Sequence, residues 1–219
     1  SSDWTAYPFA SSNRKDFENL LQVYMDAVFF SRLHPLDFAQ EGHRLEFKEA
    51  GNPNSELEFK GVVFNEMKGA MSSISSQLWH TLCKYLFPST TYHYNSGGEP
   101  EDIPDLNYAQ LKSFYQSHYH PSNAIFMTFG NIPAAEHQAR FEELALARFD
   151  ALDSHIEVGD EKRYHAPIRV QESYPLPAAE NKGDKTHIVV SWLLGKSTQL
   201  DTLLEAQLLA GVLLDNSAS

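Results

Sequence analysis

The carboxylate of Glu66 is the side chain whose surroundings most suggest chemistry. It lies in the run FKGVVFNEMKGA, residues 59–70, which has helical spacing. Side chains three and four positions apart share a helix face, so this carboxylate shares its face with Val62, Val63 and Ala70. A carboxylate buried on an apolar face needs a cation, a hydrogen-bond donor or a metal ion. From the residues alone, an ion pair with a lysine or arginine and a metal-ligand role both stay open.

The other residue types that often carry catalysis are not arranged for it. The chain has ten histidines, but neither His-Glu-x-x-His nor His-x-x-Glu-His occurs. His118 and His120 are expected at a helix end, where a side chain that can carry positive charge complements the helix C-terminus. Cys83 has Leu82 and Leu86 beside it at helical spacing, which predicts a small buried side chain and not a catalytic thiol.

Composition and charge exclude several classes of protein. The 219 residues are 42% apolar and 21% charged, which is typical of a globular protein. Lys+Arg 17 against Asp+Glu 29 gives a net charge of −12, which argues against a nucleic-acid binder and suits cationic partners. One cysteine excludes a disulfide within the chain and a cysteine-based zinc cluster. The longest apolar runs, 27–30 and 188–190, are far shorter than the ~20 residues that span a membrane.

The spacing of apolar residues predicts a chain in which strands and helices follow one another. Strands are predicted over 5–10, 43–49, 124–129, 168–173 and 187–194. Helices are predicted over 16–30, 60–71, 77–87, a segment through 108–115, 133–149 and 200–214. Pro8 confines the first strand to an edge position, because proline lacks a backbone donor. We therefore predict an α+β fold, with a two-layer sheet and helices packed on one face.

One stretch of this chain resembles a known zinc site. The segment GVVFNEMKG, residues 61–69, is similar to the part that carries the third zinc ligand in the pitrilysin/insulinase superfamily of zinc metallopeptidases (inverzincins), specifically its presequence-protease-like branch. Further blocks agree in order and spacing: YPFAS at 7–11, DF at 16–17, YMDAVFF at 24–30, QEG at 40–42, SGG at 96–98, LK at 111–112 and HYHPSNA at 118–124. The resemblance covers about 1–150 and continues more weakly to the end.

The resemblance implies a site of which this chain holds one part. In that family one helix bears His-x-x-Glu-His, whose histidines bind Zn²⁺ and whose glutamate is the general base, and a later glutamate completes the site. By resemblance Glu66 is that last metal ligand, and the missing motif is expected upstream of Ser1. No catalytic residue is therefore expected in this chain, and alone it should be inactive. Relatives often carry an acidic residue seven positions before the zinc glutamate, where this chain has Phe59 and so gives no support.

The resemblance also sets the expected domains. Residues 1–150 would be the larger, C-terminal part of a first peptidase unit, and 151–167 a polar linker. Residues 168–219 would be the truncated start of a second, homologous α+β unit, because a lone strand and helix cannot bury their apolar faces.

The leading hypothesis is a fragment of a zinc-dependent endopeptidase that hydrolyses unfolded, targeting-peptide-like oligopeptides. Two alternatives stay open: a non-catalytic structural or assembly subunit of the same superfamily, and a generic α+β scaffold in which Glu66 forms a salt bridge. The expected partners are basic peptides, the missing N-terminal segment and the C-terminal half of the same protein, with no nucleic acid and no membrane. The expected compartment is the cytoplasm in a bacterium or an organelle matrix in a eukaryote.

Overall fold

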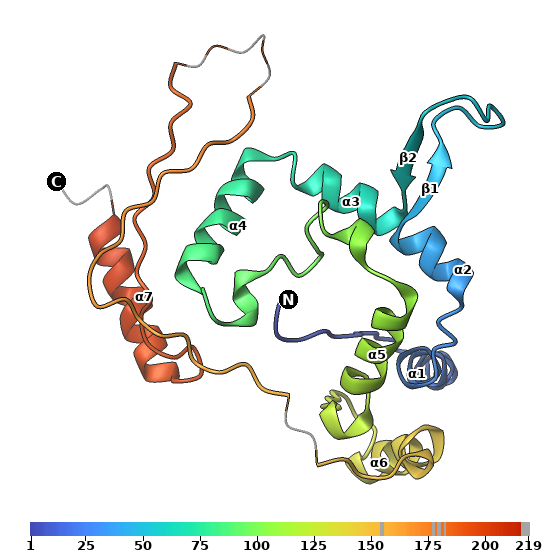
Figure 1. The fold of residues 1–219 in the computed structure, drawn as a ribbon. Coiled ribbons are helices and arrows are strands. Elements are labelled where there is room, and N and C mark those ends of the chain that lie inside the picture. The colour runs from blue at the N-terminus through green and yellow to red at the C-terminus, as the bar shows by residue number, and fades with distance from the viewer. Residues whose placement is uncertain (154–155, 177, 179–180, 182, 216–219) are drawn as a thin grey trace.

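The computed structural model contains seven α-helices and one pair of strands in the described residues, which are 1–153, 156–176, 178, 181 and 183–215 (Figure 1). The α-helices are α1 (Arg14–Phe29), α2 (Pro35–Asp37), α3 (Val62–Ala70), α4 (Ile74–Leu86), α5 (Tyr108–His118), α6 (Ala134–Leu144) and α7 (Leu200–Leu214). The strands are β1 (Arg44–Phe47) and β2 (Leu57–Lys60). Short helical turns are η1 (Phe38–Gly42), η2 (Thr91–His93), η3 (Ile103–Asp105), η4 (Pro121–Asn123) and η5 (Leu146–Arg148). This helix-rich mixture confirms the predicted α+β class.

Side chains that cap the first turn start two of the long helices. Asn13 accepts a hydrogen bond from the backbone N–H of Asp16 at 3.1 Å, as its position before the apolar spacing predicts. Asn107 and Gln110 form a reciprocal capping box at α5. Asp105, two residues earlier, lies in η3 and does not cap the helix.

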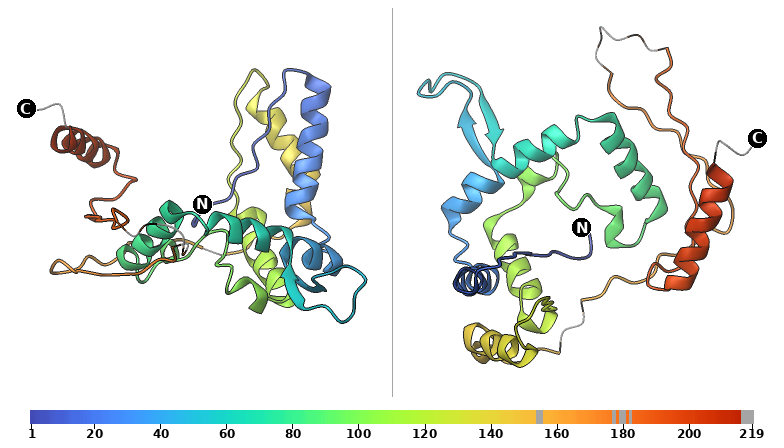
Figure 2. Two further views of the ribbon diagram at one scale, coloured as in Figure 1. Left: turned by 90° about the horizontal axis from the view of Figure 1, so that it is seen from above. Right: turned by 180° about the vertical axis from the view of Figure 1, so that it is seen from behind.

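The core lies between α1 and α6, which stand side by side (Figure 2). Leu21, Met25 and Phe29 recur at helical spacing on the buried face of α1. They meet Phe141 of α6, whose ring stacks on Phe126 with centroids 4.5 Å apart. Burying such side chains is the main favourable term in folding, so this cluster fixes the two helices and the segment that carries Phe126.

Four of the five predicted strands form no strand in the structure. Segments 5–10, 124–129, 168–173 and 187–194 have no ladder partner among the described residues, whereas 43–49 becomes β1. The side chains of 124–129 still alternate: Ala124 and Phe126 pack on the core, while Ile125 and Met127 are 94% and 91% exposed. Apolar alternation specifies which side chains face the core, but a strand also needs a neighbour for its backbone groups. The predicted strands were wrong because the described residues supply no such neighbour.

We expect Phe141→Ala to lower the free energy of unfolding of this chain by about 3–5 kcal/mol, because it empties a ring-sized volume in the core. Denaturant unfolding followed by circular dichroism measures the change. Leu36→Ala, at a side chain that is 72% exposed, should change stability by less than about 0.5 kcal/mol. Equal losses for the two variants would contradict the placement of the core.

Candidate functional site

Glu66 lies on α3 and its side chain is exposed. Within the described residues it takes part in no hydrogen bond or ion pair. The neighbouring cation on the helix, Lys68, instead lies over the ring of Phe64, 6.0 Å from its centroid. The salt-bridge interpretation of Glu66 therefore finds no partner among the described residues, and the carboxylate is open to a partner from outside them.

The apolar face that Glu66 shares is also uncovered. Val62 and Val63, one helical turn before it, are 44% and 37% exposed. The helix therefore presents a carboxylate flanked by valines to a space that no described residue fills. Covering this face would bury apolar area, which is favourable, but would desolvate the carboxylate, which is costly unless the covering part supplies a cation, a hydrogen-bond donor or a metal ion.

Two glycines let the chain pack closely around α3. A Cβ on Gly61, at the start of the helix, would lie 2.0 Å from the carbonyl oxygen of Gly42 at the end of η1. A Cβ on Gly97 would lie 2.1 Å from Sδ of Met67. The Gly97–Gly98 turn thus packs against the side of α3 that carries Met67. Sequence reasoning found the GG pair only as a turn and missed Gly61, since close approach of distant backbones leaves no periodic pattern.

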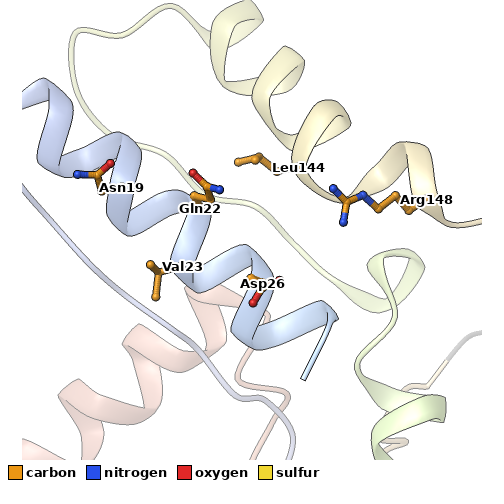
Figure 3. Close-up of a pocket in the computed structure, with 6 residues that line it drawn as sticks. All are labelled: Asn19, Gln22, Val23, Asp26, Leu144 and Arg148. Atoms are coloured by element: carbon orange, nitrogen blue, oxygen red, sulfur yellow. The ribbon is translucent and has the colours of Figure 1, made fainter. Parts of the chain in front are cut away.

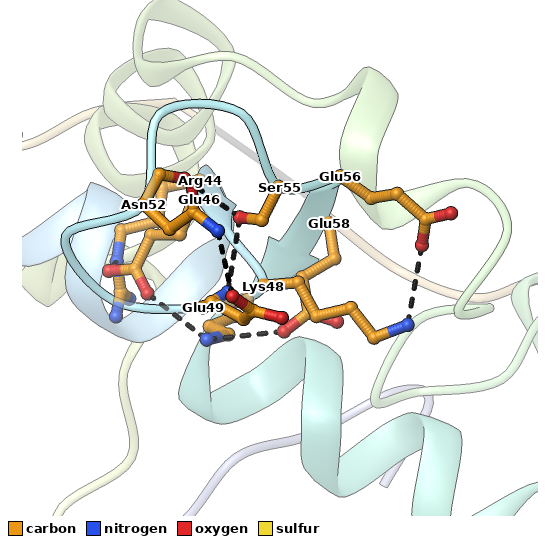
Figure 4. A network of polar contacts seen from close by, with 9 residues as sticks. Arg44, Glu46, Lys48, Glu49, Asn52, Ser55, Glu56 and Glu58 are labelled. Atoms are coloured by element: carbon orange, nitrogen blue, oxygen red, sulfur yellow. Dashed lines mark hydrogen bonds and ion pairs between the residues drawn. The ribbon is translucent and has the colours of Figure 1, made fainter.

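A hairpin stiffened by ion pairs leads directly into α3. β1 and β2 are antiparallel, with Arg44 opposite Lys60 and Glu46 opposite Glu58. Glu46 accepts from Arg44 Nε at 2.6 Å and lies 3.5 Å from Lys60 Nζ, which also lies 3.1 Å from Glu58 (Figure 4). The hydrogen bond from Arg44 holds the pKa of Glu46 below its usual value, and the bond to Glu58 raises the pKa of Lys60. Of these pairs only Lys60–Glu46 joins the two strands, because Arg44–Glu46 and Lys60–Glu58 each lie within one strand, so the backbone ladder sets the register of the strand that ends one residue before Gly61.

The other residue types noted in the sequence have structural roles. Cys83 is buried, and burial raises the pKa of its thiol, so it is inert as predicted. The ring of His118 stacks on Phe114 with centroids 3.9 Å apart at the C-terminal end of α5. His120 accepts from the backbone N–H of Ser122 at 3.1 Å and caps η4.

A complete metal centre is not present in the described part of the chain. No group of three or more histidine, cysteine, aspartate or glutamate side chains converges there closely enough to hold a metal ion. Glu66 is thus a single candidate ligand.

Helices among the described residues are too short or too polar to cross a membrane.

A hollow lies on other elements, between α1 and α6 (Figure 3). It has a volume of about 490 Å³ and is lined by Asn19, Gln22, Val23, Asp26, Leu144 and Arg148. Its one carboxylate has no histidine or second carboxylate beside it in the lining, and the guanidinium of Arg148 lies 4.9 Å from the ring centroid of Phe30. This hollow therefore suggests no chemical step.

Comparison with known proteins identifies the family to which the chain belongs. Residues 105–219 match the family described as the peptidase M16 inactive domain. This match covers more than half of the chain, so the chain belongs to the peptidase M16 (insulinase-like) family.

Individual relatives place it within that family. It is 43% identical over 219 residues to the mitochondrial presequence protease of Xenopus tropicalis, covering 100% of this chain and 21% of the relative. It is 35% identical over 218 residues to that of Schizosaccharomyces pombe, covering 100% and 22%. It is 37% identical over 222 residues to the chloroplastic/mitochondrial presequence protease 1 of Arabidopsis thaliana, covering 99% and 20%. The chain is of the presequence-protease-like branch, and it spans about a fifth of the length of these relatives.

The close contact at Gly61 predicts a sharp contrast between two glycines of the α3 region. Gly61→Ala should destabilise the chain by about 1–3 kcal/mol, because the added methyl group meets backbone that cannot move aside easily. Gly69→Ala, inside the helix with nothing within 4 Å of its Cβ, should be neutral or stabilise by up to about 1 kcal/mol. Thermal unfolding of the two variants measures the contrast; a stable Gly61→Ala chain with an unchanged near-UV spectrum would show that the close approach is not needed.

Proposed function

We propose that this chain is part of a zinc-dependent endopeptidase that hydrolyses unfolded oligopeptides, and that Glu66 is one of the metal ligands. The observation that carries the proposal is the exposed carboxylate of Glu66, free of any ion pair within the described residues, on the helix whose sequence resembles the zinc-ligand segment. Identity of 35–43% to presequence proteases over the whole chain supports the peptidase activity.

The donor type suits the metal. Carboxylate oxygen is a normal zinc ligand, and a catalytic site needs three protein ligands with an open position for water. When bound, Zn²⁺ lowers the pKa of that water so that it can attack a peptide carbonyl. This chain would fix the position of the Glu66 carboxylate. The hairpin, the contact at Gly61 and the turn at Gly97 hold α3, the helix that carries it. We propose that the two histidines and the general base come from a His-x-x-Glu-His helix upstream of Ser1.

A non-catalytic subunit is the second candidate. It is favoured by the description of the family matched over 105–219, which is an inactive domain. Glu66 lies outside that matched range and favours the enzyme. The residues upstream discriminate between the two: an intact His-x-x-Glu-His supports the peptidase, and substituted histidines support the subunit.

The relatives' names and the charge of the chain support a substrate class and a compartment. Presequences and other targeting peptides are basic and poor in acids, and the net charge of −12 suits them. The relatives are named as mitochondrial or as chloroplastic and mitochondrial proteins. We therefore propose basic oligopeptides as substrates and, for a eukaryotic host, an organelle matrix as the compartment.

Replacing the proposed ligand should remove metal and activity together. We expect Glu66→Gln in the full-length protein to lower bound zinc by about tenfold or more, because one of three protein ligands loses its charge. Elemental analysis of the purified protein measures zinc, and hydrolysis of a fluorogenic basic peptide measures activity. Glu101→Gln, a matched change at an exposed glutamate outside α3, should leave both unchanged. Full zinc occupancy in Glu66→Gln would remove Glu66 from the ligand set.

We further propose that 168–219 begins a second α+β unit, after a first unit over 1–150 and a linker over 151–167. The support is the exposure of α7, which has no buried residue although its C-terminal half, LLAGVLL at 208–214, contains no polar side chain. A helix that is apolar all round is normally enclosed on every side. We propose that polypeptide C-terminal to this chain encloses it, since the relatives are about five times longer.

A charge in the apolar half of α7 should therefore disrupt the full-length protein. We expect Leu208→Asp to reduce its stability by roughly 2–5 kcal/mol, because enclosure would leave the carboxylate unpaired. Gln207→Asp, the neighbouring position with a polar side chain, should cost much less. Thermal unfolding and soluble yield measure both. If Leu208→Asp behaves like Gln207→Asp, α7 remains exposed and the second unit is not built around it.

A further inference from the structure

A five-residue segment of the predicted linker, 160–164, contacts two separate parts of the chain with alternate residues. Glu161 and Tyr164 bond to the end of α4, at Ser89 and Tyr85. Asp160 and Arg163 bond instead to residues 194–196, the turn that leads into α7. The segment therefore lies between the region at the end of α4 and the turn that precedes α7.

On the side of the segment that faces α4, the carboxylate of Glu161 accepts several hydrogen bonds. Ser89 donates its backbone N–H to Oε2 at 2.8 Å and its hydroxyl to Oε1 at 2.6 Å. The backbone N–H of Lys162 also donates to Oε1, at 2.8 Å. These bonds, the Ser89 hydroxyl first, hold the pKa of Glu161 at about 2, against a usual 4.5. The carboxylate is thus ionised at neutral pH and its hydrogen bonds are charge-assisted.

Tyrosines extend the same contact along the linker. The hydroxyl of Tyr164 donates to the backbone carbonyl of Tyr85 at 2.8 Å. The hydroxyl of Tyr85 donates in turn to Glu172, and this bond raises the pKa of Tyr85, so the hydroxyl keeps its proton. The end of α4 and the residues just after it therefore hold the linker at 161 and 164 and the following segment at 172, although neither has a helix or strand there among the described residues.

On the other side, the bonds reach the turn before α7. Lys196 Nζ lies 2.5 Å from Asp160 Oδ2. The guanidinium of Arg163 donates to the backbone carbonyl of Leu194. The first contact joins two charged side chains, and the second joins a side chain to the backbone of the turn. Together they fix both the position and the orientation of the turn.

We propose that residues 160–164 are a two-sided clasp that couples the end of α4 to the turn before α7, and so sets how the second unit sits on the first. The inference rests on the two-unit arrangement proposed above. It makes the clasp a conformational device, because releasing either side frees the two units to move relative to each other.

The turn η2, which follows α4, also binds the N-terminal segment. Thr91 donates its hydroxyl to the carbonyl of Ser2 at 3.1 Å, and Tyr92 donates to Asp3 Oδ2 at 2.6 Å. The stretch 85–92 therefore contacts both the clasp and residues 2–3, which are 72 to 89 positions away in sequence.

Hydrogen exchange of the full-length protein, measured by mass spectrometry, tests the clasp. In Glu161→Gln, amide exchange should rise about threefold or more in peptides covering 158–166 and also in peptides covering 192–198, because the two contacts open together. Glu157→Gln, a matched change in the same linker at an exposed residue, should alter neither region. An increase confined to 158–166, or no increase, would overturn the coupling.

A double-mutant cycle identifies the contact responsible. Ser89→Ala and Glu161→Gln should each raise exchange, and the double variant should show little beyond the larger single effect, because both remove the same bonds. Additive effects would overturn the Ser89–Glu161 contact. Hydrogen exchange does not depend on zinc or on peptide hydrolysis, so the two proposals fail separately. If the clasp proposal is wrong, the zinc content is still as proposed for Glu66. If the Glu66 proposal is wrong, the exchange pattern is still as predicted for the clasp.

Discussion

The close contact of Gly61 with the carbonyl oxygen of Gly42 is the constraint on which the candidate site depends. It joins the end of β2 to the end of η1 at a distance that no Cβ would allow. The β1–β2 ladder, with the Lys60–Glu46 ion pair across it, fixes the strand that precedes this contact, and Met67 against Gly97 fixes the helix that follows it. Glu66 is therefore presented by a helix restrained at its start and along its side, which is what a metal ligand needs if it is to meet partners supplied by other segments.

The helices were predictable because each carries a local signal. Asn13 and Asn107 cap helices whose apolar residues recur at helical spacing, and both caps are observed. The strands were less predictable, since a strand is completed by a neighbour that can lie anywhere in the chain or outside it. Segment 124–129 shows the difference: Phe126 faces the core as its alternation predicts, but its backbone finds no ladder partner in the described residues.

The site was predictable in one respect. Helical spacing placed Glu66 on the face of Val62 and Val63, and the structure agrees. The spacing left an ion pair open, and only the structure shows that none forms in the described part of the chain. The contacts of Gly61 and Gly97, and the alternating bonds of 160–164, join residues far apart in sequence and so could not be read from local patterns.

Several charged side chains of this chain hold segments together: Lys60 pairs with Glu46 across the hairpin, and Glu161 accepts from Ser89. Glu66 makes no such bond within the described residues, and its metal-ligand role is proposed from its exposed position on the segment that resembles a zinc-ligand segment. The most direct test is the anomalous scattering of crystals of the full-length protein at the zinc absorption edge. The account predicts an anomalous peak about 2.0–2.2 Å from a carboxylate oxygen of Glu66; zinc bound by a complete set of other ligands, with Glu66 remote from the peak, would contradict it.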